Sequence, residues 1–205
     1  YLEWRTRCNT FDIGAANGYS ATELKEIIDY ADERGIEVIP GLALLGHAEQ
    51  LLADKNYNYL SERREGIPGR FGETIDQVLC PTIPEVKEFI DKFLKEVSEI
   101  FYNSSYIHVG GDEVFDFAIC SECKNKVKNF YDEQEIYLNH FKYINQTLQR
   151  FNKRMMLWDD MFELYPDILE QMPRDIIMVN WQYQTCVKDY LGHFANLCFY
   201  DLFET

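Results

Sequence analysis

The fold is decided by the stretch PEVKEFIDKFLKEVSEIFYNSSYIHVGGDE, residues 84–113. Over residues 84–101, apolar side chains recur at the three- and four-residue spacing that is typical of one face of an α-helix. A short apolar run follows at residues 106–109, and two glycines then precede Asp112 and Glu113. We therefore predict a helix, a buried strand and a tight turn that carries two carboxyl groups.

The same alternation runs through the rest of the chain. Ser20, with Glu23 three residues later, predicts a helix start, and Gly35 predicts its end. The predicted helices cover residues 21–34, 84–101, 133–151 and 168–172. The predicted strands cover residues 1–4, 36–40, 106–109, 155–158, 176–181 and 197–200. Alternating strands and helices indicate an α/β protein with a parallel sheet covered by helices.

The ends of these strands favour a barrel over an open sheet. Polar or aromatic residues suited to binding follow each strand, as in the active site of a (β/α)₈ TIM barrel; they are Glu3, Trp4, His47, Asp112, Glu113, Trp158, Asp159, Asp160, Asn180, Trp181, Tyr200 and Asp201. The sequence has no glycine-rich phosphate loop after its first strand, which a doubly wound nucleotide-binding fold needs. A complete barrel takes about 250 residues. We therefore expect residues 1–205 to be part of a single catalytic barrel, about strands 2 to 7, with the first and last βα units missing.

Composition limits the partners that the chain is expected to bind. The 205 residues are 46% hydrophobic, which is typical of a folded protein. Lys and Arg number 20 against 35 Asp and Glu, giving a formal net charge of −15. This charge repels phosphate backbones and anionic lipids, so we expect no nucleic-acid and no membrane partner. A neutral substrate fits it better, and the sequence leaves the compartment and the oligomeric state open.

The six cysteines do not predict a metal site. Cys120 and Cys123 form a C-x-x-C pair, but a zinc site needs two more ligands, and His140 is the one nearby candidate. We therefore expect no metal, and a local disulfide or two free thiols at this pair. The remaining cysteines are predicted to be small, buried apolar residues; they are Cys8, Cys80, Cys186 and Cys198.

The carboxyl pair at the end of the central strand is the strongest indication of chemistry. Gly110 and Gly111 permit the backbone to turn, so that Asp112 and Glu113 reach one pocket. Two neighbouring acids in a dry pocket have different pKa values, which leaves one charged and one protonated near neutral pH. That division suits glycoside hydrolysis, in which one group protonates the leaving oxygen. A solvated acidic loop is the alternative interpretation.

Aromatic residues at the strand ends also favour a sugar as substrate. Trp158 and Trp181 each close a predicted strand beside polar groups, and indole rings pack well on the C–H faces of sugar rings. His47 follows the predicted strand at residues 36–40 and is placed to orient a carboxylate. Two tryptophans in a packed core and a buried histidine are the alternative interpretations.

These motifs together resemble family 20 glycoside hydrolases, the β-N-acetylhexosaminidases. Residues 108–113, His-Val-Gly-Gly-Asp-Glu, are similar to the signature of that family. The agreement extends in order and spacing to Gly18-Tyr19-Ser20, to residues 36–40 with Gly46-His47, to Trp158-Asp159-Asp160, and to Asn180-Trp181. The similarity covers nearly the whole chain.

The resemblance implies exo hydrolysis of terminal β-linked N-acetylglucosamine or N-acetylgalactosamine, with the substrate's own 2-acetamido oxygen as nucleophile. It implies that Asp112 holds the acetamido N–H and that Glu113 is the general acid and then the base. Trp158 and Trp181 would wall the sugar site, and His47 would support the carboxylates. No metal and no organic cofactor is implied for the reaction.

The chain departs from the family pattern at both ends. Leu2-Glu3-Trp4-Arg5 stands where many members carry paired aspartates, and Tyr200 and Asp201 are adjacent rather than two positions apart. Glu3, Tyr200 and Asp201 are therefore carried over only as expected substrate contacts. Two alternatives stay open: a barrel glycosidase whose nucleophile is Asp159 or Asp160, about 5–5.5 Å from Glu113, and a non-catalytic sugar-binding relative.

Overall fold

The computed structural model describes residues 18–68 and 76–181. The elements in chain order are α1 (Ala21–Asp32), α2 (Glu49–Leu52), η1 (Asn58–Leu60), α3 (Pro84–Ile100), β1 (Tyr106–His108), α4 (Ser121–Lys126), α5 (Phe130–Arg150), β2 (Arg154–Trp158), α6 (Met161–Leu164), η2 (Pro166–Gln171) and β3 (Ile177–Val179). None of the helices in this part of the chain combines the length and the apolar composition that a membrane crossing requires.

The sheet is parallel, and its strands follow one another in chain order. β1 pairs with β2, with Tyr106 opposite Arg154, and β2 pairs with β3, with Met156 opposite Ile177. At the free edge of β1, Gly41 forms an isolated parallel bridge with His108. The three strands and the segment at Gly41 therefore lie side by side in sequential order, as neighbouring strands of a barrel do.

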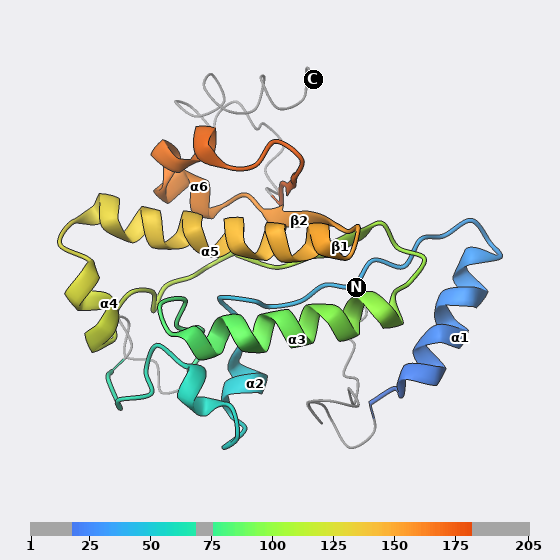
Figure 1. Cartoon of the computed structure of the whole chain (residues 1–205), viewed down its shortest axis with the longest axis horizontal. Helices are drawn as coiled ribbons and strands as arrows, with labels where there is room; N and C mark the ends of the chain where they lie inside the picture. Colours follow the sequence, from blue (N-terminus) through green and yellow to red (C-terminus); the bar gives the residue numbers. More distant parts are fainter. Residues whose placement is uncertain (1–17, 69–75, 182–205) are drawn as a thin grey trace.

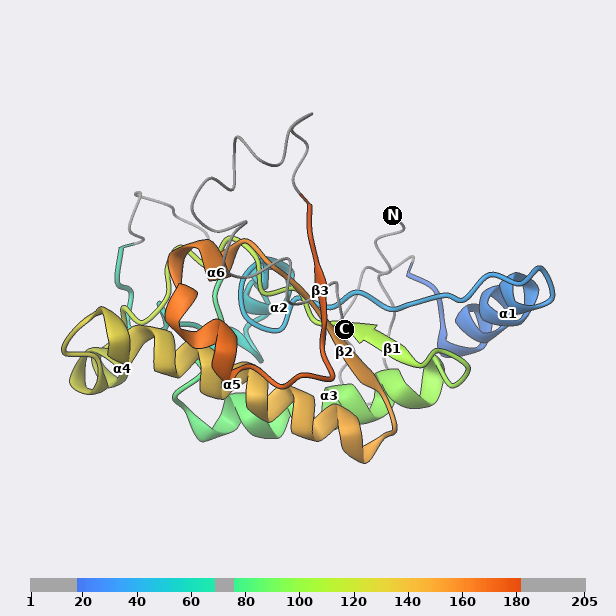
Figure 2. The same cartoon turned by 90° about the horizontal axis from the view of Figure 1, so that it is seen from above.

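Two long helices, α3 and α5, lie side by side along one face of this sheet (Figures 1 and 2). The predicted apolar face of α3 is buried, including Phe89 and Ile90, and α5 packs on β2. Helix α1 begins as predicted: the Ser20 hydroxyl accepts a hydrogen bond from the Glu23 N–H, and the Glu23 carboxylate accepts one from the Ser20 N–H. The predicted parallel α/β class is confirmed for the described residues.

Two predicted elements are wrong in detail. Residues 36–40 are not a strand, because Ile36 and Ile39 are 58% and 39% exposed and bury too little surface to hold one. Contact with β1 begins only at the end of this range, where the His108 N–H donates to the Pro40 carbonyl and Gly41 forms its bridge with His108. The predicted helix at residues 168–172 is the 3₁₀ helix η2. The predicted strands at residues 1–4 and 197–200 lie outside the described residues.

Candidate active site

The turn after β1 requires its two glycines. Gly110 and Gly111 have φ angles of 74° and 94°, in the left-handed region that side chains rarely adopt. A Cβ on Gly111 would lie 2.4 Å from Leu157 Cδ1 and 2.9 Å from Phe141 Cζ. The Tyr137 hydroxyl donates a hydrogen bond to the Gly111 carbonyl at 2.9 Å. The turn therefore packs closely against β2 and α5, and this packing fixes the direction in which the backbone of Asp112 and Glu113 leaves it.

Replacing Gly111 with alanine is expected to lower the free energy of unfolding by about 3 kcal/mol, because a clash in the core adds to backbone strain. Two other glycines separate these causes. Gly35 has a φ of 70° and open space, so Gly35→Ala should cost about 1 kcal/mol. Gly41 has open space and an ordinary φ, so Gly41→Ala should change stability by about 0.5 kcal/mol or less. Urea unfolding of the full-length protein measures all three, and equal losses for Gly111→Ala and Gly35→Ala would contradict the clash.

Three titratable side chains converge beyond this turn. The Nε2 atom of His47 lies 3.4 Å from an Asp112 carboxylate oxygen and 3.4 Å from a Glu113 carboxylate oxygen. His47 and Glu113 both hold left-handed backbone conformations, with φ angles of 55° and 47°. Such conformations in non-glycine residues cost free energy and gather at functional sites. The histidine loop also approaches closely, since a Cβ on Gly46 would lie 2.8 Å from the Asp112 carbonyl oxygen.

The carboxylates keep His47 protonated. Its hydrogen bond with Asp112 is the largest cause that raises the pKa of His47, from 6.5 to about 9; burial opposes the shift, and the charges of Asp112, Glu49 and Glu113 add to it. At neutral pH an imidazolium therefore stands between the two acids. This positive charge allows Asp112 and Glu113 to lie close together, with side chains 23% and 41% exposed.

This pairing predicts a pH-dependent stability. A pKa raised from 6.5 to about 9 stabilises the folded state fully below pH 6.5, and the contribution is lost as pH rises through 9. Burial lowers the pKa of His108 and of His140 to about 4, so these two do not titrate in that window. His47→Asn, which tolerates the left-handed backbone, should be less stable than wild type at pH 6.5 and equal to it above pH 9. Thermal unfolding across this range measures the difference, and a difference independent of pH would contradict the pairing.

Asp160 holds the turn through both of its carboxylate oxygens. One oxygen accepts the Glu113 backbone N–H at 3.0 Å, and the other accepts the Trp181 indole N–H at 3.2 Å. Asp159 beside it is 6% exposed and accepts the Asn180 amide at 2.7 Å. Burial raises the pKa of both aspartates. The segment after β3 is thus joined through one carboxylate to the turn that carries Glu113.

His108 is a neutral part of the scaffold. Its Nδ1 accepts the Gly110 backbone N–H at 3.1 Å, and its ring lies 4.4 Å, centroid to centroid, from the Trp158 ring. Burial lowers the pKa of His108 to about 4, which agrees with an unprotonated Nδ1. His108 therefore holds the glycine turn and one tryptophan, and Trp158 closes β2 beside it.

The structure brings His47, Asp112 and Glu113 together and links Trp181 to them through Asp160. The predicted contacts Glu3, Tyr200 and Asp201 lie outside the described residues. The sequence did not predict the two hydrogen bonds of Asp160. The signal that could have indicated a role for it is its position two residues after Trp158, at the end of a strand.

Two groups within the described residues bring metal-ligating atoms within 4.8 Å of one another. The first is His47 with the two acids of the candidate active site. The second is a separate cluster of Glu62, Cys80, Cys120 and Cys123. Of the two expectations for the C-x-x-C pair, a disulfide or free thiols, the structure shows free thiols. His140, the one nearby candidate ligand considered for this pair, is hydrogen-bonded to the Leu44 carbonyl.

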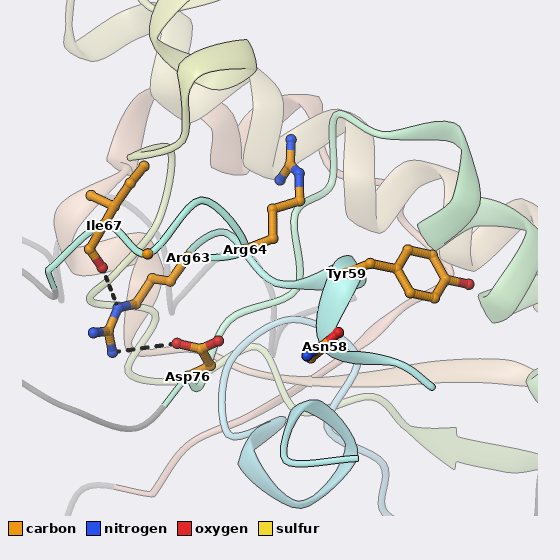
Figure 3. A pocket seen from close by; sticks show the side chains of 7 residues that line it. Asn58, Tyr59, Arg63, Arg64, Ile67 and Asp76 are labelled. Atoms are coloured by element: carbon orange, nitrogen blue, oxygen red, sulfur yellow. Dashed lines mark hydrogen bonds and ion pairs between the residues drawn. The ribbon is translucent and has the colours of Figure 1, made fainter. Parts of the chain in front are cut away.

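A pocket also opens beside the loop that follows η1 (Figure 3). Arg63 spans it, donating to the Ile67 carbonyl at 2.8 Å and pairing with Asp76 at 3.5 Å. None of the predicted site residues lines it. The pocket is therefore distinct from the site at the end of β1.

Comparison with protein families identifies the sequence pattern. The chain matches the family described as "Glycosyl hydrolase family 20, catalytic domain" over residues 5–196. It is 28% identical over 167 residues to a "Beta-hexosaminidase" of Vibrio furnissii, covering 80% of this chain and 26% of the relative. It is 30% identical over 154 residues to "Beta-hexosaminidase subunit beta" of Sus scrofa, covering 71% of this chain and 27% of the relative. The chain thus spans about a quarter of the length of these curated relatives.

Solved structures agree on the fold. The chain superposes with a TM-score of 0.69 and 23% identity on a GH20 exo β-N-acetylglucosaminidase from Vibrio harveyi, covering 92% of this chain and 32% of the other. A β-N-acetylhexosaminidase from Bacteroides fragilis gives a TM-score of 0.63 at 25% identity, covering 85% and 35%. These neighbours imply a TIM-barrel catalytic domain for the observed parallel α/β arrangement.

Proposed function

Because the chain belongs to glycosyl hydrolase family 20, we propose that it forms the core of an exo-β-N-acetylhexosaminidase active site. The proposed reaction removes terminal β-linked N-acetylglucosamine or N-acetylgalactosamine from a glycan. The observation that carries this proposal is the convergence of His47, Asp112 and Glu113 at the carboxyl end of a parallel strand. That edge is where barrel enzymes place their reacting groups.

In the proposed first step, Glu113 donates a proton to the glycosidic oxygen while the bond from that oxygen to C1 breaks. The carbonyl oxygen of the substrate's 2-acetamido group forms a bond to C1, giving an oxazolinium intermediate that has no covalent bond to the protein. In the second step, Glu113 accepts a proton from water as the water oxygen attacks C1, and the bond from C1 to the acetamido oxygen breaks, which restores the 2-acetamido group. The reaction therefore needs one acid with a movable proton and no protein nucleophile, which distinguishes it from the scheme with two reacting carboxylates.

Asp112 has the complementary task. A carboxylate that accepts the acetamido N–H holds the carbonyl oxygen toward C1 and offsets the positive charge that develops on the ring. His47 touches both acids, and its imidazolium keeps the Asp112 carboxylate charged and oriented. Asp160 is a positioning residue, since it binds the backbone of Glu113.

We propose that Trp158 and Trp181 wall the sugar-binding site, with Glu3, Tyr200 and Asp201 as further contacts. The Trp181 indole is oriented by its hydrogen bond to Asp160, and Trp158 by its packing on His108. Indole faces of this kind pack on the apolar side of a pyranose or on an acetamido methyl group. We also propose that residues 1–205 supply about strands 2 to 7 of one eight-stranded barrel, since the described strands are sequential neighbours.

The test compares two aryl β-glycosides on the full-length protein, one with a 2-acetamido group and one with a 2-hydroxyl group. Cleavage of the acetamido substrate alone, with inhibition by a thiazoline mimic of the intermediate, supports the proposal. Comparable cleavage of both would indicate a protein nucleophile such as Asp159 and overturn the mechanism. Binding of N-acetylglucosamine without cleavage of either glycoside would indicate a non-catalytic sugar-binding protein.

A further inference from the structure

A second cluster of reactive side chains lies apart from the carboxyl pair. Glu62 follows η1, Cys80 precedes α3, and Cys120 and Cys123 lie at the start of α4. All four are fully buried, with 0% exposure, and the three cysteines are free thiols. Three segments distant in the sequence therefore direct one carboxyl and three sulfur atoms to a single buried point.

The spacing of these atoms matches a tetrahedral metal site. The Cys80 Sγ lies 3.6 Å from the Cys120 Sγ and 3.7 Å from the Cys123 Sγ, and a Glu62 carboxylate oxygen lies 3.1 Å from the Cys123 Sγ. In a tetrahedral zinc site with Zn–S bonds of about 2.3 Å, sulfur atoms stand about 3.8 Å apart. We propose that Glu62, Cys80, Cys120 and Cys123 bind one zinc ion.

The groups around the cluster orient its members as the partners of metal ligands do. The second Glu62 oxygen accepts the backbone N–H groups of Ile119 and Cys120 at 3.2 and 3.0 Å. The Cys120 sulfur accepts the Cys123 backbone N–H at 3.3 Å. Glu62 is thus held with its other oxygen facing the sulfurs, and two ligands are fixed by the same short turn.

A positive side chain compensates the charge of the site. Three thiolates and a carboxylate carry more negative charge than one divalent ion neutralises, and buried charge needs a partner. Arg64 places its guanidinium 3.7 Å from the Cys120 sulfur, with its side chain 15% exposed. Figure 3 shows Arg64 pointing away from the neighbouring Arg63, which turns toward Asp76 and Ile67. The two adjacent arginines therefore have separate partners.

The ion would be structural, because four protein ligands leave no open position for substrate. It would tie the segment after Glu113, which reaches Cys120, to the segment before Cys80. The Leu79 N–H in that segment donates to the Leu45 carbonyl, and the Gln77 carbonyl accepts the Ala48 N–H. The zinc would thereby hold together the loops that carry Glu113 and His47.

This proposal departs from the expectation that the chain binds no metal and that Cys80 is an isolated core residue. The further ligands of the proposed site do not lie near the C-x-x-C pair in the sequence, so the sequence did not predict a zinc site. The other two ligands, Cys80 and Glu62, lie 40 and 58 residues before Cys120 and approach the pair only in the folded chain. A redox disulfide is the weaker alternative, because three thiols around one point leave one unpaired.

The test measures metal in the full-length protein, purified from zinc-supplemented medium without chelator. Elemental analysis is expected to give about one zinc per chain, and zinc-edge X-ray absorption is expected to show three sulfur ligands and one oxygen or nitrogen ligand. Cys80→Ser and Cys123→Ser should each lose most of the zinc, and Glu62→Gln should release it faster to a chelator. Glu88→Gln, the same kind of change at an exposed position on α3, should keep it.

A second readout covers variants that fail to fold. Chelation of the wild-type protein should lower its melting temperature by about 5 °C or more, and added zinc should restore it. Wild-type protein with less than about a tenth of a zinc per chain and an unchanged melting temperature in chelator would overturn the proposal. Neither the zinc content nor the melting temperature depends on glycoside cleavage. The metal site and the proposed activity are therefore tested independently.

Discussion

Glu113→Gln is expected to lower kcat/KM for an aryl 2-acetamido β-glycoside by about 10²- to 10⁴-fold, the usual contribution of a positioned general acid. The amide cannot donate the proton that the leaving oxygen needs, and it cannot accept one from the attacking water. The substitution keeps the shape of the side chain and the backbone hydrogen bond to Asp160. The loss should therefore lie in the chemical step rather than in folding.

The leaving group gives this prediction a specific signature. An aryl group of low pKa departs with little protonation, so Glu113→Gln should lose least on the most acidic phenol and most on a natural sugar leaving group. Glu88→Gln, an exposed change on α3, is the matched control and should keep wild-type rates. An equal loss on every leaving group would assign Glu113 to a role other than proton transfer.

The parts of the fold that follow from local pattern were predictable from the sequence. Helix α3 shows one clear apolar stripe, and its observed bounds agree with the predicted range to within one residue. The strand predicted at residues 36–40 was wrong. Its β-branched residues have a high propensity for strands, but a strand also needs a partner, and this part of the chain pairs with β1 only at Gly41, opposite His108. Periodicity identifies an element, but tertiary contact fixes its register.

The candidate site was predictable where each residue follows a strand. His47 was expected to support a carboxylate, and the structure places it equally close to Asp112 and Glu113. The link from Asp160 to Trp181 and the cluster at Cys120 depend on side chains that meet only after the strands are arranged. Such meetings have no fixed spacing in the sequence, so pattern alone does not reveal them.

Asp112→Asn is expected to lower kcat for the acetamido substrate by about 10²- to 10³-fold, the usual cost of removing one preorganised electrostatic contact. The neutral amide neither holds the acetamido N–H as an acceptor of the same strength nor offsets positive charge at C1. The same change should lower the pKa of His47 from about 9 toward 6.5, because Asp112 is the largest cause of its elevation. Steady-state kinetics and an NMR titration of the His47 ring measure the two effects.

These two measurements separate a catalytic role of Asp112 from a structural one. Glu113→Gln should leave the pKa of His47 closer to 9, since Glu113 contributes less to it than Asp112 does. Asp167→Asn, an exposed change at the start of η2, should alter neither activity nor the titration. If Asp112→Asn shifts the His47 pKa but keeps full activity, Asp112 only holds the histidine. If Asp112→Asn lowers both kcat and the pKa of His47, the same carboxylate has two roles. It keeps His47 protonated in the free protein, and it stabilises the positive charge that develops at C1 during the reaction.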